Sequence, residues 1–277
     1  MTVADSWHGL RAGDQVGNLE YMVDAAALAR YRQIVGANGS FPDLMAEDCR
    51  AMLATRAAGE TLTTVWQRLE FMRPPIRGRR IQVGGWIREV RHARDRVWIR
   101  AAAFAVDEIG TEILRSEGAF VVGCATARSE HIARLAEAQP EALNLPSSHV
   151  GDAGRLGQLR LPGQEQLDEY RQVANAMAAT DLSRDGNGPT SIIAGWLEGL
   201  MGANFGEDFR WGGELSIVHH RALTPAMTLH CDGVVLGRDT DVRGVEKWRV
   251  AMLVRDAAGH QAATAEAVVE SPSPRLV

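Results

Sequence analysis

The sequence of 277 residues is poor in lysine, in cysteine and in long apolar runs, and each shortage limits what the protein can be. Lys247 is the sole lysine, so nearly all of the 30 basic side chains are arginine, which suits bidentate recognition of phosphates and carboxylates. The net charge of −5 creates no general attraction to nucleic acid or to an anionic membrane. We therefore expect neither as a partner.

Cysteine usage and the first residues bear on the compartment. Cys49, Cys124 and Cys231 are odd in number and far apart, which argues against a disulfide framework and against a CxxC metal site. The opening MTVADSWHGLRAGDQV has no basic region followed by an apolar one, and no run approaches the roughly 18 apolar residues that span a bilayer. We expect a cytoplasmic protein that holds no metal and no other cofactor.

The chain also repeats itself. YRQIVGA at 31–37 is echoed by YRQVANA at 170–176, and LEFMRPPIRGRRIQV from Leu69 is echoed by LSIVHHRALTPAMTL from Leu215. One fixed offset aligns Phe71 with His219, Met72 with His220, Arg73 with Arg221 and Ile81 with Leu229. Further on, Trp98 stands opposite Trp248 and Gly110 opposite Gly259. Because a repeat of this length implies two similar folding units, it sets the expected architecture.

Each half is predicted to contain one long helix followed by three or four strands. The helices are expected at 41–59 and 188–206, each opening near a proline and ending at a glycine. The second helix is apolar on most faces and carries Glu198 as its one strongly polar side chain, so we expect a sheet to enclose it. The expected domains are 1–127 and 166–277, with a linker at 128–165.

In its order of elements and in the stretch LEFMRPPIRGRRIQV, the sequence resembles the MaoC-like hydratase and dehydratase group. The resemblance implies an α+β double hotdog fold, in which two tandem antiparallel sheets each wrap around a long central helix. It also implies an acyl thioester substrate, carried on coenzyme A or on an acyl carrier protein, in fatty acid or polyketide metabolism. The family hydrates 2-enoyl thioesters or dehydrates 3-hydroxyacyl thioesters. Dimerisation of the whole chain stays open.

The family's catalytic loop, Asp-x-Asn-Pro-x-His, is only partly present. Read from Asp185, the corresponding loop matches at Asp185 and Asn187, but Thr190 stands where the family has histidine. Reading from Asp181 also lacks the histidine. Either register therefore leaves half of the acid–base pair to be supplied from elsewhere.

The adjacent His219 and His220 are the replacements that the sequence offers, because they take the place of an apolar pair in the other half. Alternation along a strand sends their side chains to opposite faces, so at most one of them can enter a given groove. The catalytic candidates are thus Asp181, Asp185, His219 and His220. The expected substrate-binding residues are Asn187, Thr190, Ile193, Ala194, Gly195, Trp196 and Arg73, with N–H groups at the helix start polarising the thioester carbonyl.

These residues favour an enzyme, a hydro-lyase that adds to or eliminates from the β-carbon of a 2-enoyl or 3-hydroxyacyl thioester. Three alternatives stay open: a hotdog thioesterase, an enzyme that adds an amine in place of water, and a catalytically inactive acyl-binding protein.

Overall fold

The computed structural model describes residues 9–22, 25–35, 62–76, 78–93, 96–122, 154–161, 163, 165, 190–221, 223–240, 242 and 244–271. Within these ranges no helix is long and apolar enough to cross a membrane. The expected helix at 41–59 and the loop at 181–187 lie outside the described residues.

Ten strands and three helices make up the described part of the chain. In chain order they are β1 (Gln15–Met22), α2 (Ala25–Val35), β2 (Leu62–Phe71), β3 (Arg80–Ala93), β4 (Arg96–Asp107), β5 (Glu112–Val122), β6 (Gly154–Arg160), α6 (Thr190–Phe205), α7 (Glu207–Arg210), β7 (Glu214–His219), β8 (Thr228–Thr240), β9 (Glu246–Asp256) and β10 (Gln261–Ser271).

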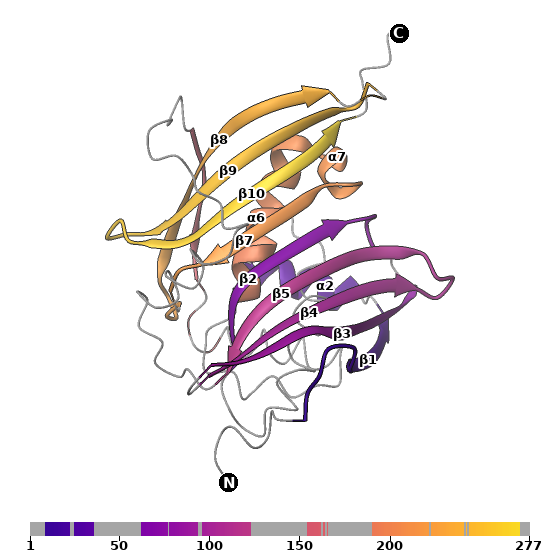
Figure 1. Cartoon of the computed structure of the whole chain (residues 1–277). Coiled ribbons are helices and arrows are strands. Elements are labelled where there is room, and N and C mark those ends of the chain that lie inside the picture. The colour runs from indigo at the N-terminus through magenta and orange to yellow at the C-terminus, as the bar shows by residue number, and fades with distance from the viewer. Residues whose placement is uncertain are drawn as a thin grey trace.

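The strands form one continuous antiparallel sheet in the order β1-β3-β4-β5-β2-β7-β10-β9-β8-β6 (Figure 1). The first five strands of this order come from the first half of the chain and the last five from the second half, in mirrored order. The two halves meet where β2 pairs with β7. This arrangement is the double hotdog that the repeat predicted.

The register places a pseudo-twofold axis at the junction between the halves. Arg68 of β2 pairs with Ser216 of β7, and the same offset of 148 residues relates Phe71 to His219. Phe71 pairs with Leu114 of β5, and His219 pairs with Ala263 of β10. The expected equivalence of Phe71 and His219 is therefore confirmed.

The expected equivalence of Trp98 and Trp248 in the two halves is wrong. Trp98 packs on the outer face of the sheet, against Val65 and Val121. Trp248 points to the inner face, where its ring lies 6.5 Å from that of Phe205 in α6. A slip of one residue moves a strand side chain to the other face, and the alignment of the two tryptophans contained such a slip.

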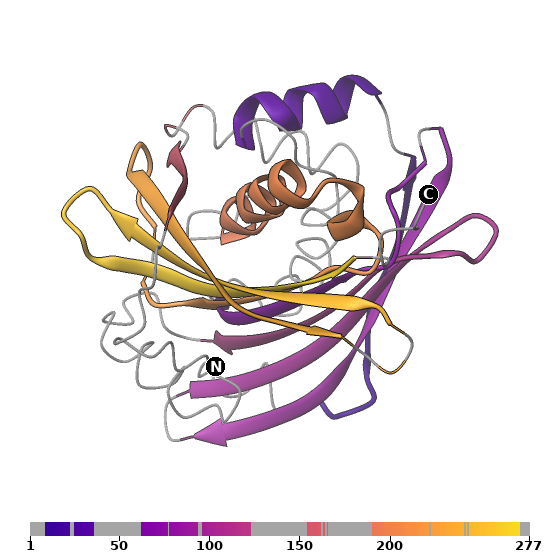
Figure 2. The same cartoon turned by 90° about the horizontal axis from the view of Figure 1, so that it is seen from above.

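Helix α6 lies in the concave side of the curved sheet, with α2 above it (Figure 2). Its side chains from Ile192 to Leu197 are buried, and Glu198 is 1% exposed and ion-paired at 3.7 Å with Arg210 of α7. The helix ends at Gly206, which has a φ of +64° and donates its N–H to the carbonyl of Gly202. The helix expected at 188–206 corresponds to α6, and its side chains are buried on most faces.

The described residues of segment 128–165, which was expected to be a linker, include the strand β6. β6 pairs with β8 at one edge of the sheet, just as β1 pairs with β3 at the other edge. The strand GRLGQLR lacks the alternation of apolar and polar residues by which strands are recognised, because its two leucines, Leu156 and Leu159, are three residues apart. The division at 127 and 165 itself stays an expectation.

Candidate functional site

His219 is the buried polar side chain that stands out on the inner face of the sheet. It alternates with Leu215 and Ile217 along β7, and both of these pack in the core that contains α6. Only 2% of His219 is exposed, and its Nε2 atom has no hydrogen-bond partner. Since buried polar atoms are nearly always hydrogen-bonded, an unpartnered imidazole nitrogen is a candidate functional group.

The surroundings of His219 are apolar. Its row across the sheet continues through Ala263, Val254 and Cys231, all of which are fully buried. Burial, together with the nearby imidazole of His220, lowers the pKa of His219 to about 3. The imidazole is therefore neutral at physiological pH, and a bound group must stabilise the imidazolium if Nε2 is to take a proton.

The end of β7 and the start of α6 lie at the same end of the molecule. The chain leaves α6, turns through α7, and returns along β7 toward the N-terminal end of α6, as both views show (Figures 1 and 2). The first N–H groups of a helix have no partner within the helix and carry a partial positive charge. The fold thus brings the imidazole of His219 and a helix N-terminus, which opens at Thr190, to one end of the sheet.

His220 lies on the opposite face, as strand alternation predicted. Its Nε2 atom is 2.9 Å from the hydroxyl oxygen of Thr264, and its backbone N–H donates to the carbonyl of Ala262. Thr264 pairs with Val218, whose side chain belongs to an outer cluster with Trp66. His220 is therefore separated from the inner face by the sheet itself.

Arg73, expected to bind substrate, lies at the other end of β7. Its guanidinium is 6.0 Å from the ring centroid of the exposed Trp211, which precedes the start of β7. Six residues of extended chain separate that start from His219, a span of roughly 20 Å at the rise of a β-strand. The structure therefore does not bring Arg73 and His219 together.

The remaining expected residues divide into two groups. Ile193, Ala194, Gly195 and Trp196 are buried in the first turns of α6, and their part in binding substrate stays a prediction. Asp181, Asp185 and Asn187 lie outside the described residues.

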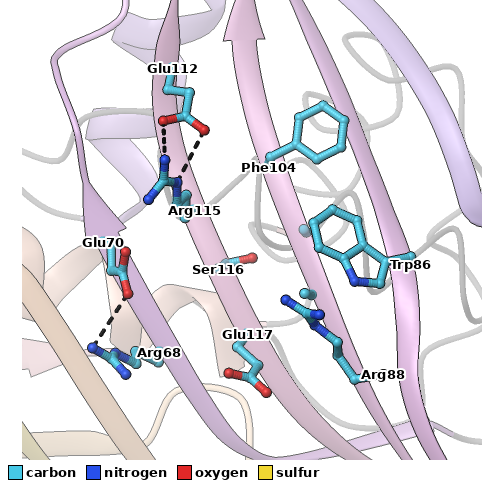
Figure 3. A pocket seen from close by; sticks show the side chains of 11 residues that line it. Arg68, Glu70, Trp86, Arg88, Phe104, Glu112, Arg115, Ser116 and Glu117 are labelled. Atoms are coloured by element: carbon cyan, nitrogen blue, oxygen red, sulfur yellow. Dashed lines mark hydrogen bonds and ion pairs between the residues drawn. The ribbon is translucent and has the colours of Figure 1, made fainter. Parts of the chain in front are cut away.

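Sequence reasoning missed a depression on the outer face of the first half (Figure 3). It has a volume of about 220 Å³ and lies over β2, β3, β4 and β5. The rings of Trp86 and Phe104 are 6.0 Å apart, and the guanidinium of Arg88 lies 4.8 Å over Trp86. The alternation of Trp86 and Arg88 along one strand was the signal that could have indicated it.

Two other kinds of site are disfavoured in the described ranges. There, no group of three or more His, Cys, Asp or Glu side chains could hold a metal ion. Cys231 is a poor nucleophile, because burial and the nearby Asp232 raise the pKa of its thiol to about 12.

Solved structures share this fold over nearly the whole chain, although no protein-family model and no curated protein matches the sequence. A MaoC-like dehydratase superposes with a TM-score of 0.64 at 14% identity, over 96% of this chain and 100% of its own. A conserved hypothetical protein of Mycobacterium tuberculosis, described as having a double hotdog fold, gives a TM-score of 0.64 at 10% identity over 98% of both chains. An acyl-ACP thioesterase from Bacteroides thetaiotaomicron gives 0.54 at 10% identity, over 98% of this chain and 100% of its own. These likenesses establish that the chain has the double hotdog fold of the MaoC-like dehydratases.

Proposed function

We propose that the protein is an enzyme that acts on acyl thioesters, adding water to the β-carbon of a 2-enoyl thioester or eliminating it from a 3-hydroxyacyl thioester. The observation that carries this proposal is the neutral, buried imidazole of His219, whose Nε2 has no hydrogen-bond partner among the described residues. An atom in this state is available to a reacting group that enters the site.

In the direction of hydration, Nε2 of His219 takes a proton from water while the water oxygen bonds to the β-carbon. The electron pair of the double bond moves toward the α-carbon and the thioester carbonyl, whose oxygen gains negative charge. N–H groups at the start of α6 stabilise that charge. A proton then reaches the α-carbon, either directly from the imidazolium or from Asp181 or Asp185, to which the imidazolium passes its own proton in turn, so the net change is the addition of one water. Asn187 and Thr190 border the same helix start in sequence and would bind the thioester.

Room for the acyl chain is proposed on the inner face of the first half. The hairpin residues Asp107 and Asp256 pair with the equivalent residues Ile81 and Leu229, which aligns β4 with β9. At equivalent inner positions β4 carries three alanines where β9 carries larger side chains: Ala101, Ala103 and Ala105 against Val250, Met252 and Val254. The smaller side chains favour an apolar chain on that side.

The second candidate is hydrolysis of the thioester, favoured by the structural likeness to an acyl-ACP thioesterase. There, His219 would activate water against the carbonyl carbon instead of the β-carbon, and the thiol would leave. An amine could replace water in β-addition, because an amine needs less activation by a base.

One experiment separates these reactions. The purified protein is incubated with 2-enoyl pantetheine thioesters of several chain lengths, with and without an added amino acid, and the products are followed by mass spectrometry and by free thiol. A gain of one water or one amine on the intact thioester supports β-addition, and thiol release supports hydrolysis. Binding without any turnover would refute an enzymatic role and leave an acyl-binding protein.

A further inference from the structure

We infer that the β3–β4 hairpin is a docking surface for an acidic carrier protein that presents the acyl thioester. This inference rests on the proposed function, and it concerns residues 88–93 of β3 and 96–100 of β4, on the two sides of the hairpin. Three features of the hairpin support it: its position in the sheet, its positive charge and an arginine at a β-bulge.

The hairpin lies at the end of the sheet where His219 lies. Val97 of β4 pairs with Val122 of β5, which pairs with Leu62 at the start of β2. The start of β2 runs beside the end of β7, because Trp66 pairs with Val218. A partner on this hairpin therefore lies at the same end of the sheet as His219 (Figure 1).

The hairpin is basic within an acidic chain. Its sequence, REVRHARDRVWIR, contains five arginines against one glutamate and one aspartate, a net charge of +3 in a protein whose total is −5. Such a local field attracts an acidic surface and raises the rate at which it associates.

Arg88 gives this surface a specific anchor. The register of β3 with β4 shifts between Ile87 and Glu89, so Arg88 is the extra residue of a β-bulge. The bulge turns its guanidinium over the ring of Trp86, at the rim of the outer depression (Figure 3). Within the described residues, Arg88 has no carboxylate partner.

The other two arginines that line the depression are already paired with carboxylates. Arg115 pairs with Glu112, and Arg68 pairs with Glu70 and, at 2.7 Å, with Glu214. The free charge that the depression offers is thus that of Arg88, held on an aromatic surface. Such a pairing of cation and ring recognises a carboxylate that is flanked by an apolar side chain.

The second half of the chain provides an internal comparison. The β8–β9 hairpin has the same bulge, with a register shift between Val235 and Gly237, but the bulged residue is Leu236. By the symmetry of the sheet this hairpin lies at the other end, where Phe71 takes the place of His219. The bulge with a cationic residue, Arg88, therefore lies at the same end of the sheet as the imidazole of His219.

The test measures binding of a purified, net-negative acyl carrier protein bearing unacylated phosphopantetheine, at low salt and at physiological salt. The variants are the double charge reversal Arg88→Glu with Arg91→Glu and, as matched control, Leu236→Glu at the equivalent bulge. The second readout is kcat/KM for one 2-enoyl group presented on the carrier protein, on coenzyme A and on pantetheine.

We expect the charge reversal to weaken carrier binding at least about tenfold at low salt and to flatten its salt dependence. Leu236→Glu should leave binding unchanged, and kcat/KM with the pantetheine thioester should stay within about twofold of wild type in both variants. Equal losses with carrier and pantetheine, equal losses in the two variants, or a loss confined to coenzyme A would overturn the inference. Carrier binding that depends on Arg88 without turnover of any thioester would support docking and refute the proposed reaction.

Discussion

Phe71 and His219 occupy equivalent positions on the two sides of one pseudo-twofold axis, yet only the phenylalanine is packed against an aromatic partner. The Phe71 ring lies 5.0 Å from that of Phe209 in α7, whereas Nε2 of His219 has no hydrogen-bond partner. The two halves of the sheet thus place an apolar ring contact at Phe71 and an imidazole with an unpartnered nitrogen at His219.

The buried imidazole predicts that stability falls in mild acid. The ordinary pKa of histidine is about 6.5, and that of folded His219 is about 3, so between these values the unfolded chain binds a proton that the folded chain does not. Wild type should lose about 1.4 kcal/mol of unfolding free energy per pH unit below pH 6 on this account. His219→Phe, which copies Phe71, should lose that part of the slope in urea titrations between pH 6 and pH 4. An unchanged slope would show that His219 is protonated in the folded protein.

The two hairpin aspartates predict a second acid transition, at lower pH. Asp107 accepts from the backbone N–H groups of Ile109 and Thr111 and pairs at 2.7 Å with Arg79. Asp256 accepts from the backbone N–H groups of Ala258 and His260, and its carboxylate lies 3.2 Å from Nδ1 of His260. Burial tends to raise the pKa of each carboxyl, but these hydrogen bonds lower it below its ordinary value.

A lowered pKa in the folded state means that each carboxylate stabilises the fold above its ordinary pKa, near 3.8, and that this stabilisation is lost as the pH falls further. Asp107→Asn and Asp256→Asn should therefore lower the urea midpoint at pH 7 and differ much less from wild type near pH 2. A difference that stays constant with pH would contradict the assignment.

Substitution of Gly213 is predicted to lower the stability of the fold. Its carbonyl accepts from the N–H of Phe71, and a Cβ atom added to it would lie 2.1 Å from the carbonyl oxygen of Phe209. Because backbone must move to relieve this clash, Gly213→Ala should destabilise the protein by about 1–3 kcal/mol. Gly237→Ala is the matched control, since a Cβ there meets nothing within 4 Å. Equal stability of the two variants in urea unfolding would contradict the packing described.

The alanines of β4 predict the chain-length range. Ala103 is equivalent to Met252, so Ala103→Met copies the second half onto the first. If the acyl chain lies there, the variant should lower kcat/KM at least about tenfold for a ten-carbon 2-enoyl thioester and much less for a four-carbon one. A loss independent of chain length would place the acyl group elsewhere.

The repeat made most of the fold predictable. Equivalence at Phe71 and His219 survived because polar and apolar residues alternate in both copies, which fixes the face of each side chain. The predicted equivalence of Trp98 and Trp248 is wrong because Trp98 lies on the outer face of the sheet and Trp248 on the inner face. β6 was missed because its two core leucines, Leu156 and Leu159, are three residues apart and so leave no period-two pattern.

The candidate site was only partly predictable. Strand alternation predicted that the adjacent histidines separate, but it could not choose the inner one, since that depends on which face α6 covers. The cationic bulge at Arg88 was not foreseen either, because a register shift comes from the pairing of two strands and leaves no mark in either strand alone.

The most direct test of the account compares His219→Gln and His220→Gln in turnover of a 2-enoyl pantetheine thioester, with folding checked by circular dichroism. The two residues are adjacent but lie on opposite faces, so each variant controls for the other. We expect His219→Gln to lower kcat by about 10²–10⁴-fold and His220→Gln to change it by less than about threefold. Wild-type kcat in His219→Gln, or an equal loss in both variants, would contradict the assignment of His219 as the base.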